Sequence, residues 1–158
     1  MQDGLFHSPS KGPLTYEAMV EDLLRYVSEE PHAKHKLIVG TDSHTRTDLC
    51  FVTAIIVHRL GKGGRYYYRR RHQPRMRSLR QRIFYEAATS LSLAEKLAES
   101  VSTQGGHLNV EIHLDIGEQG ETKDLIRDVV GMIVGSGFHA EIKPNSYGAS
   151  KVADRYTK

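Results

Sequence analysis

The chain has one cysteine, no tryptophan and no long apolar run. The single cysteine, Cys50, excludes an internal disulfide, and its place in the apolar run LCFVTAIIV predicts a small buried side chain. No apolar run approaches the roughly 20 residues that a membrane helix requires. The N-terminal segment MQDGLFHSPSKGP has no apolar signal core. These absences predict a cytoplasmic protein that makes no use of a membrane.

Two common kinds of site are also absent from the pattern. The one cysteine and the scattered histidines lack the spacing of zinc ligands. The segment GKGG at 61–64 is not a phosphate-binding loop, because the pattern GxxxxGK followed by Ser or Thr does not occur. Any metal chemistry therefore requires side chains that the fold brings together from distant parts of the chain.

The length of 158 residues is that of a single domain. Glycine and proline residues predict a flexible lead-in over residues 1–13. One domain is then expected over 14–158, opened by an amphipathic helix at about 15–30. The formal net charge of +3 and the pI near 9.0 are a mild bias toward an anionic partner.

Apolar periodicity predicts an α/β fold. Three strands are expected first, KLIVGTDSHT, LCFVTAIIVHRL and RYYYRRR, and their short connections favour antiparallel pairing. From Leu79 the apolar spacing becomes helical, and two further strands, HLNVEIHLD and FHAEIKP, alternate with helices. The expected fold is a mixed five-stranded sheet covered by helices, with three antiparallel and two parallel strands. A short last helix is expected to begin at Asn145 or Ser146.

An arginine-rich stretch leads from the third strand into the long helix. The segment from Arg69 to Arg82 holds seven arginines and no acidic residue, directly after three tyrosines. Guanidinium groups suit phosphate oxygens, and tyrosines can stack on unpaired bases. A solvated connector is the alternative interpretation. The residues predicted to bind nucleic acid are Arg69, Arg70, Arg71, Arg75, Arg77 and Tyr67.

The motifs GTDSH, HLDIG and GASKVADRYTK, with the element order after residue 36, resemble the YkuK family of ribonuclease-H-like bacterial proteins. The resemblance covers most of the chain and implies a ribonuclease-H-like fold. Enzymes of that superfamily carry acidic residues on the first strand, on the helix after the third strand, at the end of the fourth strand and on the last helix. The resemblance puts Asp42, Glu86, Asp115 and Asp154 at these places. It implies that they bind two Mg²⁺ or Mn²⁺ ions, which activate a water and stabilise the leaving oxygen of a phosphodiester.

The residues themselves support these four acids unequally. Asp42 and Asp115 follow apolar strand interiors, where open α/β sheets place ligands. Glu86 is also explained as a solvated helix residue, and Glu95 is then the alternative acid on that helix. Asp154 is also explained as one half of a surface ion pair near the end of the chain.

Three functions fit these residues. The first is a metal-dependent nuclease acting on RNA, DNA or a hybrid, in which His44, two residues after Asp42, transfers protons or binds a metal. An exposed His44 without a role is the simpler interpretation of that residue. The second function is a nucleic-acid-binding or scaffolding module that cleaves nothing. The third is an enzyme for a small phosphorylated molecule, which requires a deep closed pocket.

Overall fold

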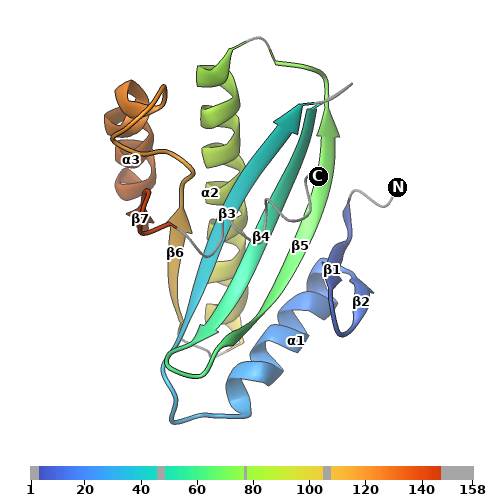
Figure 1. Cartoon of the computed structure of the whole chain (residues 1–158). Helices are drawn as coiled ribbons and strands as arrows, with labels where there is room; N and C mark the ends of the chain where they lie inside the picture. The colour runs from blue at the N-terminus through green and yellow to red at the C-terminus, as the bar shows by residue number, and fades with distance from the viewer. Residues whose placement is uncertain (1–3, 46–48, 77, 105–107, 147–158) are drawn as a thin grey trace.

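The computed structural model describes residues 4–45, 49–76, 78–104 and 108–146. The described strands form one mixed sheet of seven strands in the order β2-β1-β5-β4-β3-β6-β7 (Figure 1). No helix among the described residues is long and apolar enough to cross a membrane. The elements are β1 (Phe6–Ser8), β2 (Gly12–Leu14), α1 (Tyr16–Ser28), β3 (His35–Thr45), β4 (Leu49–Arg59), β5 (Gly64–Gln73), α2 (Leu79–Thr103), β6 (Asn109–His113), the 3₁₀ helix η2 (Lys123–Leu125), α3 (Ile126–Gly135) and β7 (His139–Glu141).

The predicted arrangement of five strands forms the middle and one side of this sheet. β3, β4 and β5 pair antiparallel, while β6 pairs parallel to β3 and β7 parallel to β6. The tight turn between β4 and β5 uses Gly61 and Gly63, whose φ angles of +79° and +87° suit glycine. The predicted long helix is α2, and α3 is the helix expected between the last two strands. The short last helix expected to begin at Asn145 or Ser146 falls on residues outside those that the structure describes.

The N-terminal segment is where the sequence prediction was wrong. We expected residues 1–13 to be a flexible lead-in and the sheet to have five strands, but β1 and β2 form a hairpin on the open edge of β5. Phe6 is fully buried in the main core, and the ring of His7 stacks on Tyr68 with centroids 5.4 Å apart. Strands of three residues are too short to show alternation in the sequence, so this pairing becomes visible only once β5 is in place.

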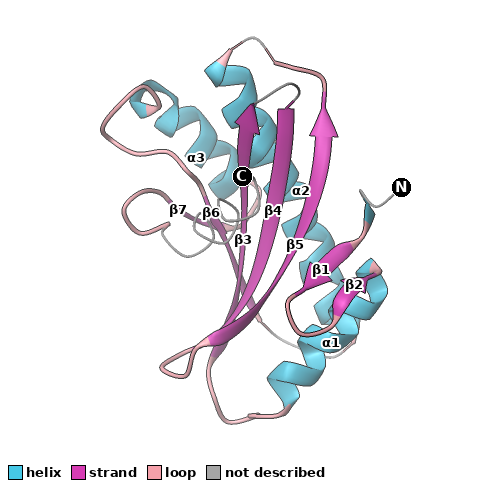
Figure 2. Ribbon diagram, turned by 45° about the vertical axis from the view of Figure 1, so that its right-hand side comes forward, coloured by secondary structure: helices cyan, strands magenta, loops and turns pink. Residues whose placement is uncertain are grey.

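The three helices cover one face of the sheet. Figure 2 shows α1 and α2 on the same side of the long strands, and one buried cluster joins all three helices to that face. Alternate residues of the strands supply the sheet side of the cluster, as the pleat requires. Its members include Met19, Leu23, Leu37, Val39, Ile55, Val57, Ala87, Ala94, Leu97, Ile112, Val129 and Ile133. Val52 and Ala54, which point to the other face, form a separate small cluster.

Helix α1, expected at about 15–30, begins after Thr15, whose hydroxyl accepts a hydrogen bond from the backbone N–H of Ala18 at 3.1 Å. Replacement of Thr15 by alanine removes this cap, and we expect it to lower the free energy of unfolding by about 1 kcal/mol. Urea denaturation measures the change. Replacement by serine keeps a capping oxygen and is expected to leave stability within a few tenths of a kcal/mol, so equal losses in both variants would contradict a capping role.

Candidate functional site

Strand β3 presents two polar side chains to opposite faces of the sheet. Ser43 faces α2, where its hydroxyl donates a hydrogen bond to the carboxylate of Glu86. Asp42, its neighbour in the strand, points to the other face. The sequence predicted that this strand has its functional end at Asp42, but backbone pairing with β4 continues to Thr45, so Asp42 lies within the strand.

Glu86 is a buried acid on the side of α2 that faces β3, with 7% of its surface exposed. Burial is the main reason that the pKa of this carboxyl rises to about 8. The hydrogen bond from Ser43 opposes the rise, and the negative charges of Asp42 and Asp115 add to it. The charges of Asp42 and Asp115 therefore reach Glu86, although Asp42 points to the opposite face of the sheet. Glu95, the alternative acid on the same helix, is exposed.

Arg82 lies one helical turn before Glu86 and holds the end of β3. Its guanidinium donates to the Ser43 hydroxyl from Nη2 at 3.0 Å and from Nε at 3.3 Å, and to the Ser43 carbonyl from Nη2 at 3.2 Å. Its positive charge also opposes the rise in the pKa of Glu86. Arg82 thus fixes the position of Ser43 and supplies part of the charge that the buried acid requires.

A chain of buried hydroxyls fixes α2 against β3 next to Glu86. The Thr41 hydroxyl lies 2.7 Å from the hydroxyl of Ser90 and 3.1 Å from that of Thr53. All three side chains are buried, so each polar group has its partner within the protein. These bonds set the height of α2 along β3 and therefore the place at which Glu86 meets Ser43.

Asp115 follows β6, the parallel neighbour of β3, and is paired with a cation from another part of the chain. The Nζ of Lys143, which follows β7, lies 2.9 Å from Oδ1 of Asp115. The stem of Lys143 passes over Gly117, where an added Cβ would lie 3.1 Å from the Lys143 Cβ. A side chain at position 117 would therefore require the stem of Lys143 to shift by a few tenths of an ångström.

The ligand atoms of Asp42, Glu86 and Asp115 do not all lie within 4.8 Å of one another. Within the described residues, one group of three histidine and carboxylate side chains has its ligand atoms within 4.8 Å of one another, and Asp42, Glu86 and Asp115 do not form a second. Two ions that lie about 4 Å apart need a wider set of ligands than this criterion allows. The oxygens of these acids are the donors that Mg²⁺ and Mn²⁺ prefer, so the donor set fits such ions.

The compact group consists of Glu111, His139 and Glu141 on β6 and β7. Its carboxylates already have partners, because Lys36 lies 3.4 Å and His113 lies 3.1 Å from Glu111. Glu141 similarly lies 2.8 Å from the Nε2 of His139. These pairs account for the clustering without an ion.

Of the two remaining predicted site residues, the structure describes His44 and does not describe Asp154. His44 lies two residues after Asp42, on the same face of β3, and is partly exposed. Asp154 lies outside the described residues. The fourth acidic position therefore stays a prediction.

Of the residues predicted to bind nucleic acid, Tyr67 cannot stack on a base. It is fully buried beneath α1, and its hydroxyl donates to Asp22 at 2.5 Å. The alternation of β5 explains this, because Tyr67 shares the core-facing side with Arg65, Arg69 and Arg71. Arg70 is exposed on the opposite face, Arg75 is exposed after the strand, and Arg77 lies outside the described residues.

Several polar residues near the acids were not singled out from the sequence. Arg82 was counted only as part of the arginine-rich stretch, although its spacing of four from Glu86 places both on one side of a helix. Ser90 and Lys143 carried no local signal, because their partners come from other elements. Contacts of this kind depend on the sheet order.

Comparison with known proteins agrees with the fold. The family model described as "Ribonuclease H-like" matches residues 18–158. The chain is 35% identical to the "Uncharacterized protein YkuK" of Bacillus subtilis (strain 168), over 98% of this chain and 97% of that protein. No solved structure matches the chain. The sheet order, the acids around β3 and the family match lead to one conclusion: this chain belongs to the Ribonuclease H-like family.

Proposed function

We propose that this chain is a metal-dependent nuclease that hydrolyses phosphodiester bonds of RNA, DNA or a hybrid. The observation that carries the proposal is the burial of Glu86 within electrostatic reach of Asp42 and Asp115. A buried carboxyl beside two further acids is costly to the fold unless a cation is added. Membership of the Ribonuclease H-like family supports the same activity.

Asp42, Glu86 and Asp115 are the residues proposed to hold Mg²⁺ or Mn²⁺, and Asp154 is the proposed fourth ligand. Two such ions, when bound, would activate a water and stabilise the leaving oxygen of the phosphodiester. Ser43 and Arg82 keep the Glu86 carboxylate in position. Because metal ligands must be deprotonated, ion binding is expected to release the proton that Glu86 holds at neutral pH.

His44 and the arginines complete the proposed site. His44 follows Asp42 on the same face of β3, and its imidazole is proposed to transfer a proton during the reaction. Arg75 lies exposed between β5 and α2, on the segment that leads into the helix bearing Glu86. Its guanidinium is proposed to hold a phosphate of the strand. Affinity for nucleic acid is then expected to fall steeply as salt rises.

The test is a cleavage assay with labelled single-stranded, duplex, hybrid and branched substrates. Each is incubated with wild type and with Asp42→Asn, in Mg²⁺, in Mn²⁺ and in chelator. We expect cleavage of at least one substrate that requires an added ion and is lost in the variant. Cleavage that survives in Asp42→Asn or in chelator would contradict the proposal. Binding of nucleic acid without ion-dependent cleavage of any substrate would favour a non-catalytic binding module.

A further inference from the structure

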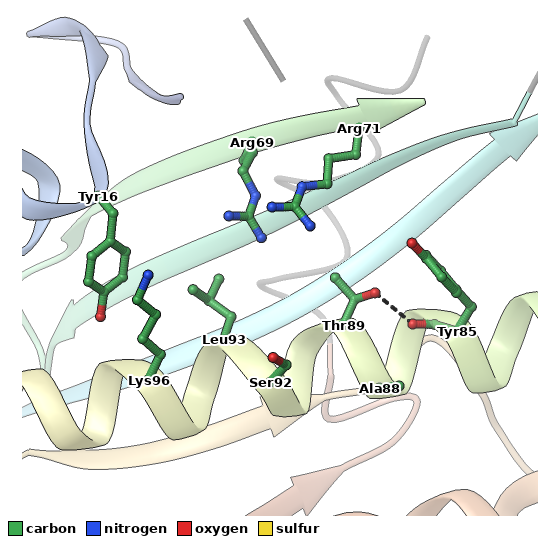
Figure 3. Close-up of a pocket in the computed structure, with 9 residues that line it drawn as sticks. All are labelled: Tyr16, Arg69, Arg71, Tyr85, Ala88, Thr89, Ser92, Leu93 and Lys96. Carbon is green, nitrogen blue, oxygen red and sulfur yellow. Dashed lines mark hydrogen bonds between the residues drawn. The ribbon is translucent and has the colours of Figure 1, made fainter. Parts of the chain in front are cut away.

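A second polar site lies in a pocket between β5 and α2. The pocket has a volume of about 360 Å³ and contains three cationic side chains, Arg69, Arg71 and Lys96. Figure 3 shows both guanidinium groups pointing from β5 across the pocket toward α2. The rings of Tyr16 and Tyr85 lie at its two ends. None of the described residues that line it is acidic.

The charge of Arg69 is not balanced within the described structure. Its guanidinium is half-buried, packs over the ring of Phe6 at 4.8 Å, and leaves the buried Nε without a hydrogen-bond partner among the described residues. Burial and the like charge of Arg71 lower the pKa of Arg69 to about 10. Because no described residue that lines the pocket is a carboxylate, burial of the Arg69 charge costs free energy, which a bound anion would offset.

Hydroxyl groups and aromatic surface add to this charge. Ser92 and Tyr85 present their side chains to the pocket from α2. The Thr89 hydroxyl donates to the Tyr85 carbonyl at 2.8 Å and is already engaged. Arginine forks and hydroxyls are typical phosphate ligands, and a pocket of this volume holds more than a bare phosphate. The tyrosine rings offer the flat surface on which a base or sugar can pack.

We propose that this pocket binds one nucleotide through its phosphate, which Arg69, Arg71 and Lys96 hold. The choice of a nucleotide rests on the proposed nuclease function, whereas the anion site itself stands on the pocket. Tyr85 precedes Glu86 on α2, so the pocket lies along the same helix as one of the proposed metal ligands. The nucleotide is either the 5′-phosphorylated end of a bound strand or a free nucleotide.

Binding is tested in chelator, where cleavage does not interfere. The probes are adenosine 5′-monophosphate, adenosine, and one short oligonucleotide with and without a 5′-phosphate, each titrated by calorimetry or fluorescence anisotropy. The pocket variants are Arg71→Gln and Lys96→Gln, both at exposed side chains. The matched controls are Arg127→Gln on α3 and Lys62→Gln, whose lysine pairs with Glu30 at 3.1 Å. Thermal melts check that every variant folds.

We expect a phosphorylated probe to bind at least tenfold more tightly than its unphosphorylated partner. Each pocket variant should lose about tenfold in affinity for it, as expected for one charge-assisted contact, and each control less than twofold. Tight binding of the monophosphate assigns the pocket to a free nucleotide, and tight binding of the phosphorylated strand alone assigns it to the substrate.

Equal affinity of both members of each probe pair, or equal losses in pocket and control variants, would overturn the proposal. Asp42→Asn separates the two proposals, because it is expected to keep the nucleotide affinity of wild type. If no protein cleaves any substrate while the pocket variants still lose affinity, the nuclease proposal fails and the pocket stands.

Discussion

Replacement of Asp42 by asparagine is expected to lower ion-dependent cleavage by more than about a hundredfold. Changes to residues that only support metal ligands already cost 10- to 100-fold in affinity or activity, and a ligand itself should cost more. Asparagine keeps the shape of the side chain but loses the charge that attracts the ion. Because Asp42 also raises the pKa of Glu86, its neutralisation is expected to lower that pKa. Steady-state rates across a range of Mg²⁺ concentrations measure the effect.

The matched control for this variant is Asp128→Asn. Asp128 lies on α3, is exposed and pairs with Arg80 at 3.6 Å. Its replacement removes the same charge and is expected to change the rate less than twofold. If both variants lost activity equally, net charge rather than ligation would explain the loss.

Replacement of Glu86 by glutamine is expected to stabilise the protein in chelator and to flatten the dependence of its stability on pH. The pKa of this carboxyl is about 8 in the folded chain, against an ordinary value of 4.5. As pH rises from about 4.5 to 8, the unfolded chain releases this proton before the folded chain does, so stability falls through that range. The loss is complete above pH 8 and is on the order of 3–5 kcal/mol. Glutamine removes this loss and can still accept the hydrogen bond from Ser43.

Urea denaturation between pH 4 and pH 9 tests this expectation. Wild type should lose stability toward pH 8, and Glu86→Gln should not show this component. Glu95→Gln is the matched control, because Glu95 is an exposed residue of the same helix, and its profile should follow wild type. Saturating Mg²⁺ is expected to stabilise wild type and to have little effect on Glu86→Gln. Parallel profiles for wild type and Glu86→Gln would contradict a raised pKa of the Glu86 carboxyl in the folded chain.

The main elements could be predicted because they are long and strongly patterned. β3, β4 and β5 have ten or eleven residues each, and α2 has 25, enough to show a period of two or of 3.6. The hairpin of β1 and β2 was missed because each strand has three residues and pairs only at an edge. The role given to Tyr67 was wrong for a related reason, since the strand face that α1 covers cannot be read from β5 alone.

The order of the longer strands and helices, and the candidates Asp42 and Asp115, could be predicted from the sequence, because apolar periodicity and the polar residues that follow it are properties of short segments. Which polar side chains contact one another could be seen only in the tertiary structure. Glu86 is the candidate ligand that the tertiary structure supports most, although the sequence supported it less than Asp42. Its burial and its raised pKa arise from its contacts with β3 and from the charges of Asp42 and Asp115. The pairing of Lys143 with Asp115 and the pocket of Arg69 and Arg71 arise in the same way. Electrostatic energy depends on distance and burial in space, and neither can be read from spacing along the chain.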